Sequence, residues 1–197
     1  YNIQLEIGNI FAGNQKQPFW IQTNQLGRVE VEESNQGFLN FIAKKTLMND
    51  TVKKKFLEAG IDVCGRYYES GQLQFIQYWG RYNYKGFYIH AGAKGEADLY
   101  NGLSITNGNM YLSNNARPLP RIEIGTESLK PFKKGFGQKF SFSALYSEYL
   151  LIDDRYIDNV NLHHKKLRIN YLLKPAWSLS FVIDHWVYWG GKTPEGE

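Results

Sequence analysis

The sequence lacks three features that would each define a familiar class of protein. Its apolar runs extend over only a few residues, far fewer than the ~20 that a membrane-spanning helix needs, so a passage through a membrane would have to use β-strands. Cys64 is the one cysteine, which excludes an intramolecular disulfide and a cysteine-based metal finger. Helical periodicity is almost absent from the chain, so an all-α fold is not expected.

Charge of one sign is not concentrated anywhere in the chain. Lys and Arg together number 23 against 19 Asp and Glu, for a net charge of +4, and the basic residues are scattered. Nucleic acid is therefore not an expected partner, whereas an acidic glycan or anionic lipid headgroups are compatible with this balance. The chain starts at Tyr1 without a signal-peptide pattern, and its end, Gly190–Glu197, looks like the start of a loop. We therefore expect residues 1–197 to form one β-barrel segment, the N-terminal part of a longer barrel.

Aromatic residues and period-two alternation are abundant. Tyr, Phe and Trp make up 16% of the chain, and such rings suit β-sheets, membrane interfaces and carbohydrate surfaces. Alternation of apolar and polar residues predicts strands. The expected strands are 55–68, 73–84, 87–94, 139–146, 167–171 and 177–184, with weaker ones near 3–10, 37–44 and 121–126.

The two faces of these strands differ in an unusual way. In 55–68, the residues Leu57, Ala59, Ile61, Val63 and Tyr67 share one face, and Glu58, Asp62, Cys64 and Arg66 share the other. In 73–84, alternation places Ile76, Tyr78, Gly80, Tyr82 and Tyr84 opposite Gln77, Trp79, Arg81 and Asn83, and in 87–94 it places Phe87, Ile89, Ala91 and Ala93 opposite Tyr88, His90, Gly92 and Lys94. A polar face that carries both charges fits a water-filled lumen, with the apolar face turned to lipid.

The expected connections support this interpretation. One set is mostly short (49–54, 84–86, 127–135 and 174–176), and the other is mostly long (13–35, 95–120, 151–161 and the Gly-rich end, with the short 69–72 as the exception). Short turns on one rim and long loops on the other are typical of outer-membrane barrels. The sequence predicts an all-β fold: an antiparallel up-and-down transmembrane β-barrel, partial, with about nine strands, in the outer membrane of a Gram-negative bacterium. A soluble β-sandwich is the alternative fold.

Three phrases of the sequence together resemble a known family. They are Pro18-Phe19-Trp20 with Asn24 and Gly27, the segment from Leu112 to Gly125 (LSNNARPLPRIEIG), and the region from Asn161-Leu162-His163-His164 to Asp184-His185-Trp186-Val187-Tyr188-Trp189-Gly190-Gly191. In order and approximate spacing they resemble the capsule assembly Wzi family in its Bacteroidetes form, of which this chain would be roughly the first half. The strand ending in that family reads Gln-Trp-Gly-Gly, whereas this chain has Tyr188 before Trp189.

The resemblance implies an outer-membrane barrel that binds or retains capsular polysaccharide or exopolysaccharide at the cell surface, without catalysis and without a cofactor. The expected partners are that polysaccharide, outer-membrane lipid and other outer-membrane assembly proteins. No enzyme is expected from the residues either, because Ser141 and Ser143 have no evident histidine partner for acyl hydrolysis. His163 and His164 would point to opposite faces of a strand and could not chelate one metal ion. A porin or transport barrel in a larger surface assembly and a soluble β-sandwich lectin remain alternative functions.

Candidate polysaccharide-binding residues are aromatic or charged side chains expected on the polar face or near the long loops. They are Trp79, Arg81, His90, Lys94, Arg117, Arg121, Asp184 and Trp189. Aromatic rings pack on the C–H faces of sugars, and an Arg side chain can bind a sugar carboxylate through two hydrogen bonds. The alternative is that charges on this face neutralise one another, with Arg66 and Arg81 against Glu58 and Asp62. The outward tyrosines Tyr78, Tyr82, Tyr84, Tyr146 and Tyr171 are expected to form interfacial girdles.

Overall fold

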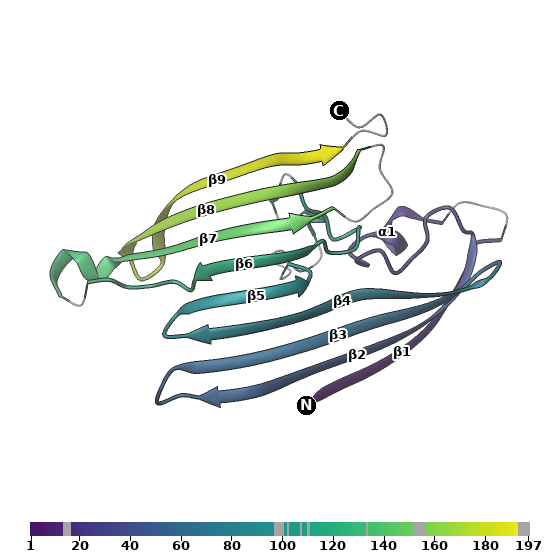
Figure 1. Ribbon diagram of the computed structural model, residues 1–197, viewed down its shortest axis with the longest axis horizontal. Helices are drawn as coiled ribbons and strands as arrows, with labels where there is room; N and C mark the ends of the chain where they lie inside the picture. Colours follow the sequence, from purple (N-terminus) through teal and green to yellow (C-terminus); the bar gives the residue numbers. More distant parts are fainter. Residues whose placement is uncertain are drawn as a thin grey trace. The chain divides into compact units, whose positions relative to one another are not determined.

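The fold is all-β, with strands that follow one another in chain order. The structure is a computed structural model that describes residues 1–13, 17–96, 101, 103–106, 108–109, 111–132, 134–151 and 157–192. Within these residues the nine strands are β1 (Asn2–Phe11), β2 (Asn35–Asp50), β3 (Lys55–Tyr67), β4 (Gly71–Tyr84), β5 (Phe87–Ala93), β6 (Pro120–Thr126), β7 (Phe140–Leu150), β8 (Asp158–Lys174) and β9 (Trp177–Lys192). They form one antiparallel up-and-down sheet in the order β1 to β9 (Figure 1).

The sheet is open, because β1 and β9 stand at the two ends of this order. The predicted all-β class and up-and-down strand order are therefore confirmed, and an open sheet is what a part of a barrel would form. Two short helices, α1 (Phe19–Gln22) and the 3₁₀ helix η1 (Gly135–Lys139), lie in connections. Neither these nor any other helix of the described residues is long and apolar enough to cross a membrane.

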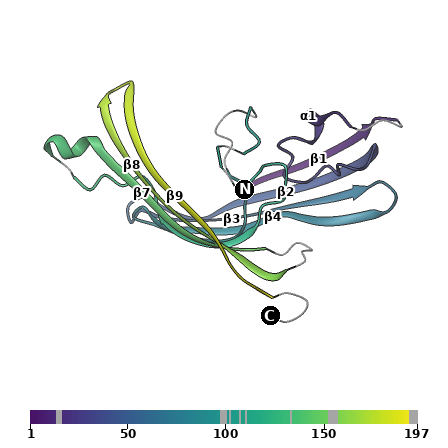
Figure 2. The same ribbon diagram turned by 90° about the horizontal axis from the view of Figure 1, so that it is seen from above.

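The chain groups into two compact units, and the long strands β2 to β5 contribute residues to both. The first unit comprises Tyr1–Thr46, Glu58–Gly80 and Gly92–Pro118, and the second comprises Leu47–Leu57, Arg81–Ala91 and Leu119–Glu197. In the first unit, α1 and the chain that follows it lie to one side of β1 and β2 (Figure 2).

The second unit contains a long ladder between β7, β8 and β9. Residues Phe140–Leu150 of β7 pair with Tyr171–Asn161 of β8, and β8 pairs with β9 from Lys174 opposite Trp177 to Asp158 opposite Lys192. The prediction that a loop begins at Gly190 is therefore wrong, because Gly190 still pairs with Val160 in the sheet. Gly190 and Gly191 have φ angles of 73° and 105°, which glycine adopts at little cost, so the strand passes through them. Thr193–Glu197 lie outside the described residues.

A tight two-residue turn joins β4 and β5 into a hairpin. Its two residues, Lys85 and Gly86, have φ angles of 52° and 87°. Positive φ at both central residues is the requirement of a type I′ turn, which matches the twist of the flanking strands. The short connection predicted around Gly86 is confirmed.

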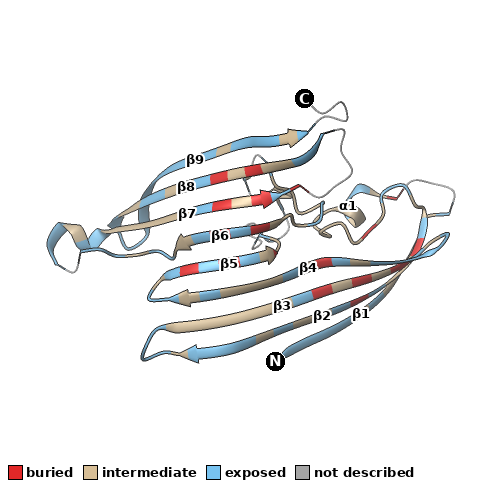
Figure 3. Cartoon of the chain, in the orientation of Figure 1, coloured by how far each residue is buried: buried red, intermediate tan, exposed pale blue. Residues whose placement is uncertain are grey.

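Alternation along the strands is confirmed, with two shifts of phase (Figure 3). Ile76, which we expected to share a face with Tyr78, is 1% exposed whereas Tyr78 is 40% exposed. Ala93, expected on the outward face, is 2% exposed. The backbone explains the second shift: Gly92 has φ 111°, and a Cβ there would lie 2.1 Å from the carbonyl oxygen of Tyr78, so alternation is broken at a position that only glycine can occupy.

Candidate functional site

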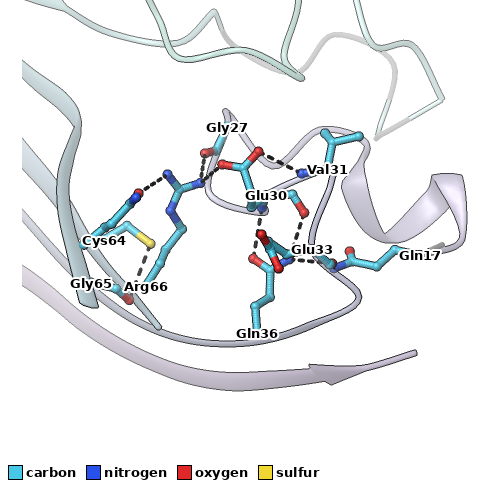
Figure 4. Close-up of polar contacts among 10 residues, drawn as sticks. Gln17, Gly27, Glu30, Val31, Glu33, Gln36, Cys64, Gly65 and Arg66 are labelled. Atoms are coloured by element: carbon cyan, nitrogen blue, oxygen red, sulfur yellow. Dashed lines mark hydrogen bonds and ion pairs between the residues drawn. The ribbon is translucent and has the colours of Figure 1, made fainter. Parts of the chain in front are cut away.

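Arg66 anchors a loop on the polar face of the first unit (Figure 4). Its side chain extends from β3 and is almost fully buried. One terminal nitrogen lies 3.3 Å from a carboxylate oxygen of Glu30 and donates a hydrogen bond of 3.4 Å to the carbonyl of Gly27. The other terminal nitrogen donates to Gln72 at 3.3 Å. The guanidinium therefore ties the connection between β1 and β2 to strand β3.

A second charged pair fixes the same connection. Arg28 forms a salt bridge with Asp62 of β3, which is buried and also accepts a hydrogen bond of 3.0 Å from the side chain of Gln77. Charge neutralisation on this face thus occurs, but not between the partners expected from sequence. Arg66 pairs with Glu30, and Asp62 pairs with Arg28, because the connecting loop supplies partners that alternation within strands cannot reveal.

Two of the three family-like phrases meet in the first unit. The backbone N–H of Leu26 donates to the carbonyl of Asn114 at 2.7 Å, and the N–H of Asn24 donates to the side chain of Asn115 at 2.9 Å. Gly27 has φ 74°, and a Cβ there would lie 3.1 Å from Cγ of Arg117. Arg117 packs through its stem against this turn, and the residue as a whole is exposed.

Trp79 and Lys94, two predicted binding residues, are brought together. The Lys94 ammonium lies 3.6 Å from the centre of the Trp79 ring and 3.6 Å from a carboxylate oxygen of Glu58. The ring also lies over Gly60, where a Cβ would come within 2.8 Å of the indole nitrogen. Cation–π contact of this kind contributes about 0.5–2 kcal/mol, so the pair is a preformed aromatic and basic element of the polar face.

The second unit contains a buried polar network around Glu123 of β6. The carboxylate accepts hydrogen bonds from Tyr88 at 3.0 Å, from Arg121 at 3.1 Å and from Ser147 at 2.7 Å. Arg121 also lies 5.4 Å from the ring centre of Tyr149. Arg121, a predicted binding residue, is thereby buried within the protein's own polar network, and His90, another predicted binding residue, is also buried.

Substitution of Gly125 by alanine is expected to destabilise this network. A Cβ at Gly125 would lie 2.6 Å from the Tyr88 hydroxyl oxygen and 2.8 Å from the carbonyl of Ala144, so the Tyr88 ring would have to move and its hydrogen bond to Glu123 would be lost. Overpacking of this kind costs about 1–3 kcal/mol, to be measured by urea unfolding of the full-length protein. Gly71→Ala is the matched control, because no atom lies within 4 Å of a Cβ there; equal stability of the two variants would contradict the prediction.

Asp184 belongs to a second polar cluster on β8 and β9. Its carboxylate contacts Nε2 of His164 at 2.7 Å and the ammonium of Lys166 at 3.0 Å. The His164 ring stacks on Trp186 with ring centres 3.5 Å apart and planes inclined by 7°. The predicted residue Asp184 is therefore held in place, and His164, Lys166 and Trp186 are neighbours that sequence reasoning did not select.

Trp189 lies on the opposite face of β9 from Asp184. Its indole N–H donates to Glu148 at 3.0 Å, and the same carboxylate contacts Nδ1 of His163 at 2.5 Å and accepts from the Tyr146 hydroxyl at 2.9 Å. His163 and His164 lie opposite Glu148 and Ser147, so they point to opposite faces as predicted. Trp189 therefore cannot join Asp184 in one binding site.

Arg81 faces a polar cavity in the second unit. Its guanidinium lies 3.8 Å from the ring centre of Tyr88 and forms a 2.6 Å salt bridge with Glu127, which also accepts a hydrogen bond of 3.1 Å from Asn83. The cavity, of about 290 Å³, extends to Lys166 and Arg168 of β8. Sequence reasoning missed both of these cations, although their two-residue spacing on an alternating strand was the available signal.

The fold and the ion pairs on the polar face together define the class of this protein. The chain is an all-β protein whose single open sheet has buried ion pairs on one face. Within the described ranges, no three His, Cys, Asp or Glu side chains come together as a metal site would need. Comparison of the chain with protein-family models, with curated proteins and with solved structures finds no match.

Proposed function

We propose that the chain is part of an outer-membrane β-barrel that binds or retains capsular polysaccharide or exopolysaccharide at the surface of a Gram-negative bacterium. In this proposal it acts as a capsule assembly protein similar to the Wzi family, by non-covalent binding and without a cofactor. The apolar strand faces contact outer-membrane lipid, and the polar faces and connecting loops contact the glycan.

The observation that carries the membrane part of the proposal is the inverted burial of polar and apolar side chains. On β6, Ile122 and Ile124 are 65% and 51% exposed, whereas Arg121 and Glu123, which alternate with them, are 8% and 7% exposed. A soluble protein buries apolar side chains and exposes charged ones, and contiguous exposed apolar surface marks contact with a membrane or a partner. Lipid outside and paired charges inside would account for this inversion.

The same inversion continues on the neighbouring strands. On the outward face of the β7–β9 ladder, Phe142 lies opposite Ile169, which lies opposite Phe181. The opposite face carries His164, Lys166 and Asp184, as described above. A soluble β-sandwich would hide one apolar face between two sheets, but the described strands form one sheet, so the sandwich lectin is the weaker candidate.

The polysaccharide part of the proposal rests on the resemblance and on the chemistry of the polar face. Trp79 with Lys94 and Arg81 with Tyr88 each place a cation on an aromatic ring, at 3.6 Å and 3.8 Å respectively. Both pairs supply positive charge to the polar face, and the half-buried Trp79 ring adds an aromatic surface; acidic sugars use contacts of both kinds. No matched relative contributes to this part of the proposal.

Deletion of the gene in a capsule-producing strain tests the whole proposal. The protein should fractionate with the outer membrane and migrate differently on gels before and after heating, and capsule should be shed into the medium after deletion. Complementation with the wild-type gene should restore retention and thereby exclude an indirect effect. Recovery of a freely soluble protein with no heat-dependent mobility would overturn the membrane part, and unchanged capsule retention after deletion would overturn the polysaccharide part.

A further inference from the structure

The cavity beside Arg81 has the composition of an anion-binding site. Its wall comes from the β4–β5 hairpin and from β6, β7 and β8, all within the second unit, and its residues are Arg81, Tyr88, Thr126, Glu127, Ser128, Ser143, Ala144, Leu145, Lys166 and Arg168. Three of these side chains are cationic at neutral pH, whereas Glu127 is the one carboxylate among them. The cavity therefore carries a net positive charge.

The three cations differ in how far the protein itself neutralises them. Arg81 is paired with Glu127 at 2.6 Å, and Lys166 is paired with Asp184 at 3.0 Å. Arg168 is exposed, and its side chain forms no salt bridge or hydrogen bond with any part of the chain that the structure describes, although its backbone pairs in the sheet. Its planar guanidinium retains donors that can bind a carboxylate through two parallel hydrogen bonds.

Hydroxyl groups supply the neutral donors and acceptors that a sugar needs. Ser143 lies directly opposite Arg168 in the β7–β8 ladder, so their side chains share a face. The Thr126 hydroxyl accepts a hydrogen bond of 3.0 Å from the backbone N–H of Ala144, which leaves its own proton to donate. The cavity volume of about 290 Å³ lies at the lower end of the range for small-molecule sites, ~300–1,000 Å³, and suits a single sugar unit better than a longer oligosaccharide.

We propose that this cavity binds a carboxylate-bearing sugar unit, of the uronic acid type, with Arg168 contacting the carboxylate and Arg81 and Lys166 providing the surrounding positive charge. The inference rests on the proposed polysaccharide function and adds the chemical class of the sugar. The cavity is lined by residues of the strands and by Glu127 and Ser128 directly after β6, so the bound unit lies on the polar strand face rather than on the long loops.

The test compares two oligosaccharides that differ only in the carboxylate. Oligogalacturonate and its carboxyl-reduced derivative, equal in length and linkage, are titrated into the full-length protein in detergent, and binding is measured by calorimetry. Oligogalacturonate should bind at least about tenfold more tightly than the reduced form, and Arg168→Gln should abolish most of that difference. Inorganic phosphate serves as a competitor that carries the alternative anion.

Lys174→Gln is the matched control, because it removes one positive charge from an exposed position at the end of the same strand. It should bind oligogalacturonate as the wild type does, and both variants should show the wild-type heat-dependent gel mobility. Equal binding of the two oligosaccharides, or equal loss in the two variants, would overturn the assignment. A further outcome is that phosphate displaces oligogalacturonate at concentrations at which a sulfonate buffer does not. That result would indicate a site for a phosphorylated sugar and would also overturn the assignment. These outcomes differ from a failure of the proposed function, in which deletion of the gene leaves capsule retention unchanged.

Discussion

Replacement of Glu123 by alanine is expected to destabilise the protein by about 3–5 kcal/mol, the cost of removing one partner of a buried ion pair. Glu123 is 7% exposed, and its carboxylate accepts hydrogen bonds from Tyr88, Arg121 and Ser147 at 2.7–3.1 Å. Its removal leaves the buried guanidinium of Arg121 without its carboxylate and two hydroxyl donors without their acceptor. Urea unfolding of the full-length protein, followed by tryptophan fluorescence, measures the change in the free energy of unfolding.

Two further variants make this result specific to the network. Glu69→Ala removes a carboxylate from an exposed connection and should change the free energy of unfolding by less than about 0.5 kcal/mol. Replacement of both Arg121 and Glu123 by leucine removes the pair together and should cost less than Glu123→Ala alone, because no uncompensated charge remains. A double variant less stable than the single one would contradict a role for the unpaired charge.

The strands could be predicted from sequence because alternation is a local signal. Six of the predicted strands were read from residues that alternate in type, such as Phe140 to Tyr146, and each of these regions is a strand. Strand ends were predicted less well. β8 extends from Asp158 to Lys174 and β9 continues to Lys192, because pairing between the two strands continues through polar and glycine residues that carry no alternation.

Breaks in alternation could not be predicted, since they depend on backbone geometry rather than on residue type. Gly92 adopts φ 111° close to the carbonyl of Tyr78, and this shifts Ala93 to the buried side. Nothing in the local pattern distinguishes Gly92 from a glycine that merely alternates. The burial of Ile76 could not be predicted either, because its apolar side chain fits either face of the sheet.

The candidate site was predicted only in part, because many of its contacts join residues that are far apart along the chain. Trp79 and Lys94 were both selected as candidate binding residues, and they meet because Trp79 is on β4, Lys94 directly follows β5, and one short turn joins these two strands. The partners of Arg66 and Asp62 come from Glu30 and Arg28 in a connection more than thirty residues earlier, and no periodicity encodes such contacts. Arg168 was missed because the segment around it was judged by its apolar residues, Leu167 and Ile169.

Phe181→Arg is expected to distinguish a lipid-facing strand from a soluble surface. Phe181 is 60% exposed and lies opposite Ile169, which in turn lies opposite Phe142. If this face contacts lipid, an arginine there is destabilising, by up to about 2–4 kcal/mol, the cost at the bilayer midplane. If it contacts water, an exposed substitution changes the free energy of unfolding by less than about 0.5 kcal/mol. Unfolding of the full-length protein in phospholipid vesicles measures the difference.

Ser180→Arg is the matched control, since it introduces the same side chain one residue earlier on the opposite face of β9. Ser180 lies opposite Asn170 and donates to it at 2.6 Å, so its replacement removes one exposed hydrogen bond and places the arginine among polar side chains. In a barrel the Ser180 variant should insert and stay close to wild-type stability, while the Phe181 variant loses several kcal/mol, on the order of the lipid cost above. Equal stability of the two variants would mean that both faces contact the same solvent, and the membrane assignment would fail with it.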